Sequence, residues 1–98
     1  MRIIARKTLV RFWEAGHADA EQPLKAWFAE VSRARWSAMA ELKRRYPHAR
    51  IIDRERVVLK IGGNKFRLVV KVWFLGQTVW IKFVGTHRAY DELDVGSL

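Results

Sequence analysis

Strict alternation of apolar side chains in the second half of the sequence is the feature that most constrains the fold. In the segment Lys65–Leu75 every second residue from Phe66 onward is apolar, and Arg56–Ile61 and Thr78–Val84 repeat the pattern. A period of two residues is that of a β-strand with one buried face. The intervening Gly62-Gly63-Asn64 and Gly76-Gln77 are typical of hairpin turns. The second half therefore predicts an antiparallel meander.

The two faces of these predicted strands differ in chemistry. One face is entirely apolar and consists of Val57, Leu59, Ile61, Phe66, Leu68, Val70, Val72, Phe74, Val79, Ile81 and Phe83. The other face mixes cations with aromatic and small apolar residues and consists of Arg56, Val58, Lys60, Lys65, Arg67, Val69, Lys71, Trp73, Thr78, Trp80, Lys82 and Val84. We expect helices to cover the apolar face and the mixed face to stay open to solvent.

The first half shows helical periodicity. Leu9, Phe12 and Trp13 form one apolar stripe, Ser37 is a suitable helix cap, and Pro47 ends a helix. The predicted elements are a strand at Met1–Ala5, helices at Arg6–Ala15, from Pro23 to about Arg35 and from Ser37 to Tyr46, and a strand at Ile51-Ile52. The fold class is therefore α+β, with an N-terminal strand and two to three helices packed on one face of a three- to four-stranded antiparallel sheet.

Length and composition limit what this fold can be. A chain of 98 residues holds one domain, so we expect a single domain over residues 1–98. The absence of cysteine excludes disulfides and thiolate metal cages, and the three histidines are far apart, so we expect no metal and no cofactor. No apolar run approaches the roughly 18 residues of a membrane span. We place the protein in the cytoplasm, without a membrane partner.

The charge distribution points to a polyanionic partner. The chain carries 19 Lys and Arg against 10 Asp and Glu, and the segment Arg56–Tyr90 contains cations but no acidic residue. Cations that hold phosphates, beside rings that stack on unpaired bases, are how sheet surfaces bind RNA. An ordinary solvated face is the simpler alternative, but such a face usually mixes signs across its strands. The mixed face therefore favours RNA.

Few residues are suited to catalysis. The chain lacks cysteine, a nucleophilic serine motif, a phosphate-binding glycine loop and a carboxylate pair. RNA, however, supplies its own nucleophile in the 2′-hydroxyl, so a base, an acid and positive charge suffice. His87 and Tyr90 are three residues apart and Asp91 is four from His87, which places them together on a helical turn. An isolated histidine is more often a capping or packing residue, but Arg67 on the same face favours chemistry.

Other residues allow two interpretations. Asn64 most simply takes a left-handed turn position, although it could also contact RNA. Trp36 and Trp73 are either the edge of the core or a surface for a partner.

Two motifs carry a resemblance to a known family. They are Gly63-Asn64-Lys65-Phe66-Arg67-Leu68-Val69 and Gly85-Thr86-His87-x-x-Tyr90-Asp91, preceded by Phe12-Trp13-Glu14 and Asp19-Ala20-Glu21-Gln22-Pro23-Leu24. With these motifs, in this order, the chain resembles HigB-type toxins of type II toxin–antitoxin systems over nearly its whole length. The resemblance implies the RelE-like fold and a toxin that cuts messenger RNA, typically on the translating ribosome. It also implies a HigA-type antitoxin with a helix-turn-helix.

The resemblance also suggests roles for individual residues. The polar positions of the family motifs fall on Asn64, Lys65, Arg67, His87, Tyr90 and Asp91. We expect Arg67 to stabilise charge on the phosphate, His87 and Tyr90 to transfer protons, and Asp91 to orient His87. The residues expected to bind RNA are Lys60, Asn64, Lys65, Lys71, Lys82 and Arg88.

Three functions compete on the sequence alone. The first is a metal-independent endoribonuclease toxin, the second a non-catalytic RNA- or ribosome-binding module that uses the same face, and the third a protein that binds a partner through exposed tryptophan. The histidine and tyrosine beside an arginine-bearing sheet favour the first.

Overall fold

A computed structural model describes residues 1–98. Its elements are β1 (Arg2–Ile4), α1 (Arg6–Glu14), the 3₁₀ helix η1 (Ala18–Ala20), α2 (Glu21–Arg33), α3 (Met39–Arg45), β2 (Arg50–Ile51), β3 (Arg56–Ile61), β4 (Phe66–Trp73), β5 (Thr78–Thr86), α4 (His87–Asp91) and the 3₁₀ helix η2 (Val95–Ser97). Together they form the predicted α+β domain, which is consistent with a RelE-like fold. No helix is long and apolar enough to cross a membrane.

The strands form one five-stranded sheet in the order β1-β5-β4-β3-β2. Strands β2 to β5 pair antiparallel and confirm the predicted meander. Strand β1 extends the sheet by pairing in parallel with β5, and Ile3 lies opposite Val79. The β3–β4 turn takes its left-handed conformations at Gly62 and Gly63, with φ of 64° and 72°, so these two glycines close the hairpin.

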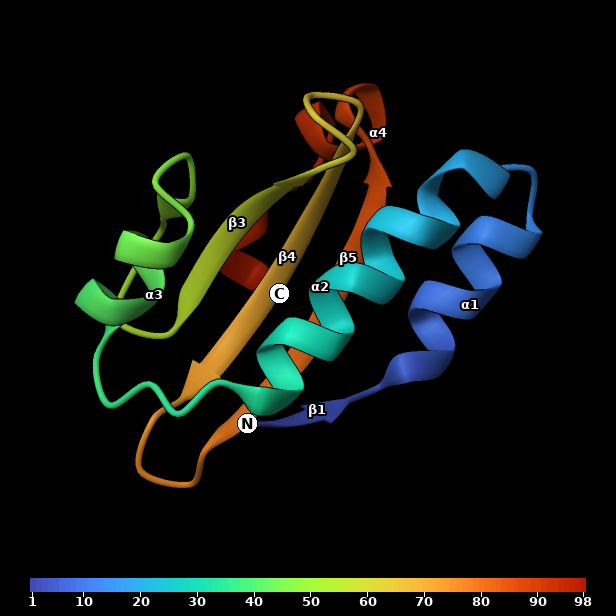
Figure 1. Cartoon of the computed structure of the whole chain (residues 1–98). Helices are drawn as coiled ribbons and strands as arrows, with labels where there is room; N and C mark the ends of the chain where they lie inside the picture. Colours follow the sequence, from blue (N-terminus) through green and yellow to red (C-terminus); the bar gives the residue numbers. More distant parts are fainter.

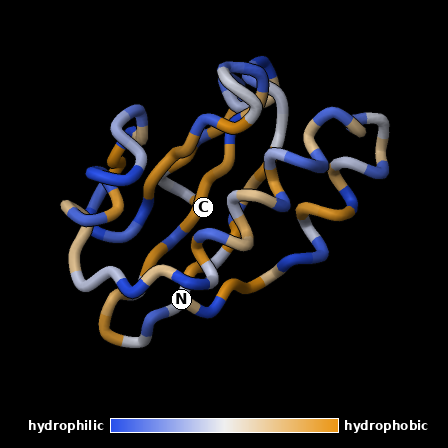
Figure 2. The backbone as a smooth tube through the Cα atoms, in the orientation of Figure 1, coloured by the Kyte–Doolittle hydropathy of each residue, from blue (hydrophilic) through white to orange (hydrophobic).

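Helices α1, α2 and α3 share a core with one face of the sheet (Figure 1). The core joins Leu9 and Trp13 of α1, Trp27 of α2 and Leu42 of α3 to alternate residues of β3, β4 and β5. Figure 2 shows hydrophobic and hydrophilic stretches alternating along α1 and α2, as expected for helices that bury one side. Trp36 is partly buried against this core, so it is core edge.

Two helix boundaries differ from the sequence predictions. Helix α2 begins at Glu21, ahead of Pro23, because η1 leads directly into it. The cap of α3 is Ala38, one residue after the predicted Ser37. The Glu41 carboxylate accepts from the Ser37 hydroxyl at 2.8 Å and from the Ala38 amide at 3.0 Å. Hydrogen bonds from Ser37 hold the pKa of Glu41 below its ordinary value.

A β-bulge corrects the predicted faces of β5. Val69 pairs with Phe83, but the next residue of β4, Val70, pairs with Ile81, so Lys82 is an extra residue. Beyond the bulge the alternation of β5 is inverted. Val84 lies in the helix-side core, and Phe83 lies opposite Val69 on the other face. Simple alternation predicts the opposite, with Phe83 on the apolar face and Val84 on the mixed face, and is wrong here.

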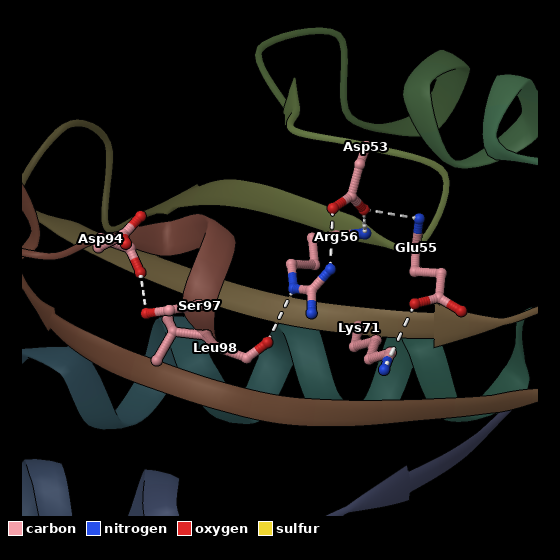
Figure 3. Close-up of polar contacts among 7 residues, drawn as sticks. All are labelled: Asp53, Glu55, Arg56, Lys71, Asp94, Ser97 and Leu98. Atoms are coloured by element: carbon pink, nitrogen blue, oxygen red, sulfur yellow. Dashed lines mark hydrogen bonds and ion pairs between the residues drawn. The ribbon is translucent and has the colours of Figure 1, made fainter.

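The face opposite the helices, here called the reverse face, is only partly open. Val58 and Val69 lie on it and are 4% and 0% exposed, yet neither belongs to the helix-side core. The chain after α4 runs behind the sheet as seen in Figure 1, and Leu98 accepts at its main-chain oxygen from Arg56 Nε at 2.7 Å (Figure 3). The prediction of a fully open face is therefore wrong. The buried valines on this face must be shielded from water by other residues, and the alternation within single strands does not predict this burial.

Candidate active site

The end of β5, the β3–β4 turn and the start of α4 meet at one end of the sheet (Figure 1). The register places Phe66 opposite Thr86, so the chain leaves β5 beside the residues that enter β4. The amide of His87 donates to the carbonyl oxygen of Lys65 at 3.3 Å. On the neighbouring pair of the ladder, Arg67 lies opposite the residue that precedes Thr86. The fold therefore brings His87 and Arg67 to the same end of the sheet, as predicted.

Helix α4 presents an exposed imidazole next to a carboxylate. The Thr86 hydroxyl caps the helix by accepting from the amide of Ala89 at 3.1 Å. One turn along, His87 Nε2 lies 3.4 Å from Asp91 Oδ1, and the two side chains are 52% and 62% exposed. The spacing predicted from the sequence is thus realised, and the imidazole is accessible to a ligand.

Tyr90 faces a residue that the sequence analysis missed. Its hydroxyl accepts from Arg50 Nη1 at 3.4 Å, across 40 positions of sequence. The two side chains share a hollow of about 360 Å³ whose other lining residues are Ile52, Asp91, Leu93, Val95 and Gly96. Arg50 begins the short edge strand β2, and only the pairing of β2 with β3 brings it here. No local motif in the sequence marks it.

Arg67 is far less accessible than predicted. Its side chain is on the reverse face, but the residue is only 6% exposed. Its Nη1 donates to the carbonyl oxygens of Asn64 and Phe66 at 3.0 and 3.3 Å, and its Nη2 donates to Asn64 Oδ1 at 2.8 Å. A buried guanidinium requires such partners. Arg67 is therefore anchored to the β3–β4 turn rather than extended toward solvent.

Asn64 has a different task from the one predicted. The left-handed positions of the turn belong to Gly62 and Gly63, and Asn64 is not among the residues with positive φ. Its side-chain oxygen accepts from Arg67 instead. The prediction of a left-handed Asn64 is therefore wrong, because two preceding glycines already supply the turn geometry.

Three further predicted cations surround this end of the sheet. Lys60 is exposed and lies directly opposite Arg67 in the β3–β4 register. Arg88 is exposed on α4. Lys65 instead reaches η1, where its Nζ lies 2.5 Å from Asp19 Oδ2, and this bond holds the pKa of Asp19 below its ordinary value. Lys65 is thus already engaged with a carboxylate, whereas Lys60 and Arg88 form no ion pair within the protein.

The middle of the reverse face does contain acidic groups, contrary to the expectation from strand composition. Lys71 Nζ lies 3.3 Å from Glu55 Oε2, and Arg56 Nη1 lies 2.8 Å from Asp53 Oδ2 (Figure 3). Amides of the same loop donate to Asp53 and lower the pKa of that carboxyl. Both acids come from the β2–β3 loop, just outside the segment that lacks acidic residues. Through these two ion pairs, acidic groups from the loop neutralise two of the cations of the face.

Lys82 differs from these neighbours. It is the extra residue of the bulge, it is exposed, and it has no acidic partner. It shares a hollow of about 240 Å³ with Trp73, Trp80 and the Lys71–Glu55 pair. Of the two lysines predicted to bind RNA in this part of the face, Lys71 is paired with Glu55 and Lys82 has no acidic partner.

The donor groups at the site are those of acid–base and electrostatic chemistry. No cluster of three His, Asp or Glu side chains is close enough to hold a metal ion. The site offers instead an imidazole, a phenol and several cations within a few residues of the same strand end. Such groups transfer protons and neutralise phosphate charge.

The sequence was also compared with known proteins. The family model described as HigB_toxin, the RelE-like toxic component of a toxin-antitoxin system, matches residues 20–93. No curated protein sequence matches the chain. The matched region contains α2, the whole antiparallel part of the sheet and α4. Because it covers most of the sequence, the chain belongs to the HigB family of RelE-like toxins, and its function is that of the toxic component of a toxin–antitoxin system.

Proposed function

We propose that this toxin is a metal-independent endoribonuclease that cleaves messenger RNA in the cytoplasm. The observation that carries the proposal is the exposed His87–Asp91 pair at the sheet end that also holds Tyr90, Lys60 and Arg88. Family membership adds support, because RelE-like toxins are generally ribonucleases. The proposed antitoxin partner is of the HigA type, with a helix-turn-helix, and the proposed setting is mRNA on the translating ribosome.

The proposed reaction uses the substrate's own nucleophile. The 2′-oxygen of one nucleotide attacks the adjacent phosphorus, and the bond from phosphorus to the 5′-oxygen of the next nucleotide breaks. The products are a 2′,3′-cyclic phosphate and a 5′-hydroxyl. One protein group takes the proton of the 2′-hydroxyl, and another gives a proton to the departing 5′-oxygen. We assign these steps to His87 and Tyr90, without ordering them.

The surrounding residues support the reaction in different ways. Asp91, whose Oδ1 lies 3.4 Å from His87 Nε2, is proposed to orient His87. Lys60 and Arg88, both exposed, are proposed to bind the phosphates on either side of the scissile bond. Arg67 is buried and its side chain is hydrogen-bonded to Asn64. We propose that Arg67 contributes positive charge to the site from below and holds the β3–β4 turn in position.

A second function is favoured by one observation. The near-complete burial of Arg67 leaves it poorly placed to contact a phosphate directly. A module that binds RNA or the ribosome without cleaving it would not need that contact. It would still use Lys60, Lys82 and Arg88.

One experiment separates the two. The toxin is purified from its antitoxin complex, incubated with a defined single-stranded RNA in excess EDTA, and the product ends are mapped. We expect cleavage to persist in EDTA and to leave 2′,3′-cyclic phosphates. If the toxin binds RNA but leaves it intact, both as free RNA in EDTA and on programmed ribosomes assayed separately in Mg²⁺ buffer, the binding module would be established instead.

A further inference from the structure

The hairpin end of β4 and β5 exposes aromatic surface. Trp73 is 53% exposed and Leu75 is 94% exposed, which makes them two of the three large exposed apolar residues of the protein. Figure 2 shows the hydrophobic colour continuing past the end of β4 into this hairpin. Trp73 stacks on Trp80 of the neighbouring strand, with ring centroids 6.3 Å apart and planes 26° from parallel. The other exposed residue, Ile51, lies on the distant edge strand β2.

The backbone holds this pair of rings in place. A Cβ atom at Gly76 would lie 2.1 Å from the indole of Trp73, so only glycine allows the ring to lie against the hairpin. Thr78 supports the same turn, because its hydroxyl donates to the carbonyl oxygen of Gly76 at 2.8 Å. The Trp73 ring therefore lies directly against the backbone of the hairpin at Gly76.

The charged residues beside the rings are two cations and one acid, Lys71, Lys82 and Glu55. The hollow of about 240 Å³ that contains both tryptophans is also lined by Lys71 and Lys82. Lys71 is paired with Glu55, but Lys82 has no acidic partner. An exposed aromatic surface bordered by a free cation matches a ligand that has a flat ring and a negative charge.

We infer that Trp73, Trp80 and Lys82 form a binding subsite for one unpaired base of single-stranded RNA and its phosphate. The inference rests on the proposed function for the identity of the ligand. Arg67 and Trp73 are six positions apart on β4, which corresponds to about 20 Å at 3.3 Å per residue. The subsite therefore grips the strand well away from His87 and adds affinity without taking part in cleavage.

A protein ligand is the competing occupant, since exposed tryptophan is also common at protein interfaces. The unpaired cation beside the rings, Lys82, favours RNA over a protein ligand. A purely apolar patch would suit the hydrophobic face of a partner helix, whereas Lys71 and Lys82 border the rings on the side of the sheet face. Trp73 is the exposed tryptophan and Trp80 is partly buried, whereas Trp13 and Trp27 are buried and Trp36 packs against the core, so a ligand that stacks on Trp73 can be followed by fluorescence.

The test uses full-length toxin carrying His87→Gln, so that RNA is not consumed. Its tryptophan emission is titrated with a single-stranded oligoadenylate and with an RNA duplex of the same length. We expect the single strand to quench the emission saturably, and Trp73→Ala to weaken its affinity about tenfold and remove most of the quenching. Trp73→Phe keeps a ring and should give an intermediate affinity. Leu75→Ala, an exposed apolar change in the same hairpin, is the matched control and should bind like the parent.

Each result decides the inference. Unchanged affinity and quenching in a folded Trp73→Ala variant would overturn it, as would equal losses in Trp73→Ala and Leu75→Ala. Loss of antitoxin binding with full RNA affinity would overturn it in favour of a protein-docking surface. Quenching that depends on Trp73 while the wild-type protein cleaves no RNA would support the subsite and refute the nuclease. If the wild type cleaves RNA and Trp73→Ala changes neither affinity nor quenching, the nuclease is supported and the subsite is refuted.

Discussion

The two ends of the β4–β5 pair carry different kinds of side chain. At the α4 end, polar groups lie against one another: Arg67 is hydrogen-bonded to Asn64, and His87 Nε2 lies 3.4 Å from Asp91 Oδ1. Toward the hairpin end, Trp73 and Trp80 stack, and Lys82 at the middle of β5 has no acidic partner. Fixed polar groups suit a reaction that needs exact placement, whereas exposed rings and a free cation suit the holding of a strand. Under the proposed function, cleavage takes place at the α4 end and the RNA strand is held toward the hairpin end.

The largest expected effect is at the α4 end. His87→Gln should lower RNA cleavage by at least about 100-fold, since a proton-transfer group contributes that much or more. Its affinity for RNA should change little. Cleavage rates and binding are measured on the same RNA. The matched control is His48→Gln, an exposed histidine outside the site. Equal activity of both variants would remove His87 from the mechanism.

Arg67 offers the next largest effect at the same end. Arg67→Ala should reduce cleavage by about 10- to 100-fold, less than loss of a direct transition-state donor, and should also lower the melting temperature because two carbonyl oxygens lose their donor. Asn64→Ala, which removes one bond to Arg67, should reproduce part of both losses. An Asn64→Ala protein with full activity would show that the bond between the two side chains is dispensable.

Alanine substitutions at two glycines, one near each end of the β4–β5 pair, compare the roles of the two ends. Gly85 lies under the ring of Phe83, where a Cβ would meet the ring at 2.5 Å, and Gly76 lies under Trp73 at 2.1 Å. Alanine at either position should cost about 1–3 kcal/mol of stability, as overpacking does. We expect Gly76→Ala to affect RNA affinity more and Gly85→Ala to affect cleavage more. The melting temperature, the RNA affinity and the cleavage rate are measured for both variants. If the two variants lose affinity and cleavage in the same proportion, the two ends do not have separate roles.

A smaller effect is expected between the two ends. Glu55→Gln removes the partner of Lys71 and should tighten RNA binding a few-fold. The dependence of log affinity on log salt should steepen by about one phosphate contact. Binding is measured over a salt series, with Glu14→Gln on α1 as a control of equal charge change. If both variants tighten binding equally, only net charge matters.

The smallest effect concerns acid stability. Asp19, Glu41 and Asp53 have folded pKa values below their ordinary ones, because hydrogen-bond donors favour the charged forms. Their contribution is therefore present above about pH 4 and is lost as the pH falls through the folded pKa values. Asp53→Asn should reduce the drop in melting temperature between pH 6 and pH 3. A drop of unchanged size would mean that its bonds to the loop do not stabilise the fold.

Alternation and turn chemistry were enough to predict the meander and its hairpins. The same reasoning failed at Phe83 and Val84, because a bulge is a property of two paired strands and leaves little trace in one. It also failed at Val58 and Val69, which are buried on the reverse face although no predicted element covers that face.

The site was predictable where its residues are close in sequence. His87, Tyr90 and Asp91 share one short helix, so their spacing revealed them. Arg50 joins them only through strand pairing, and the burial of Arg67 depends on where the β3–β4 turn places Asn64. Long-range contacts of this kind are set by topology, which residue spacing does not encode.

The single extra residue at Lys82 sets the phase in which β5 delivers the chain to α4. A strand shortened by Lys82 alone would form a regular ladder with Phe83 and Val84 on their present faces, because Val70 and Val69 already lie opposite Ile81 and Phe83. Deletion of Lys82 should therefore preserve the approach to His87, whereas a one-residue deletion elsewhere in β5 would turn the side chains beyond it to the opposite face unless the bulge were lost as well.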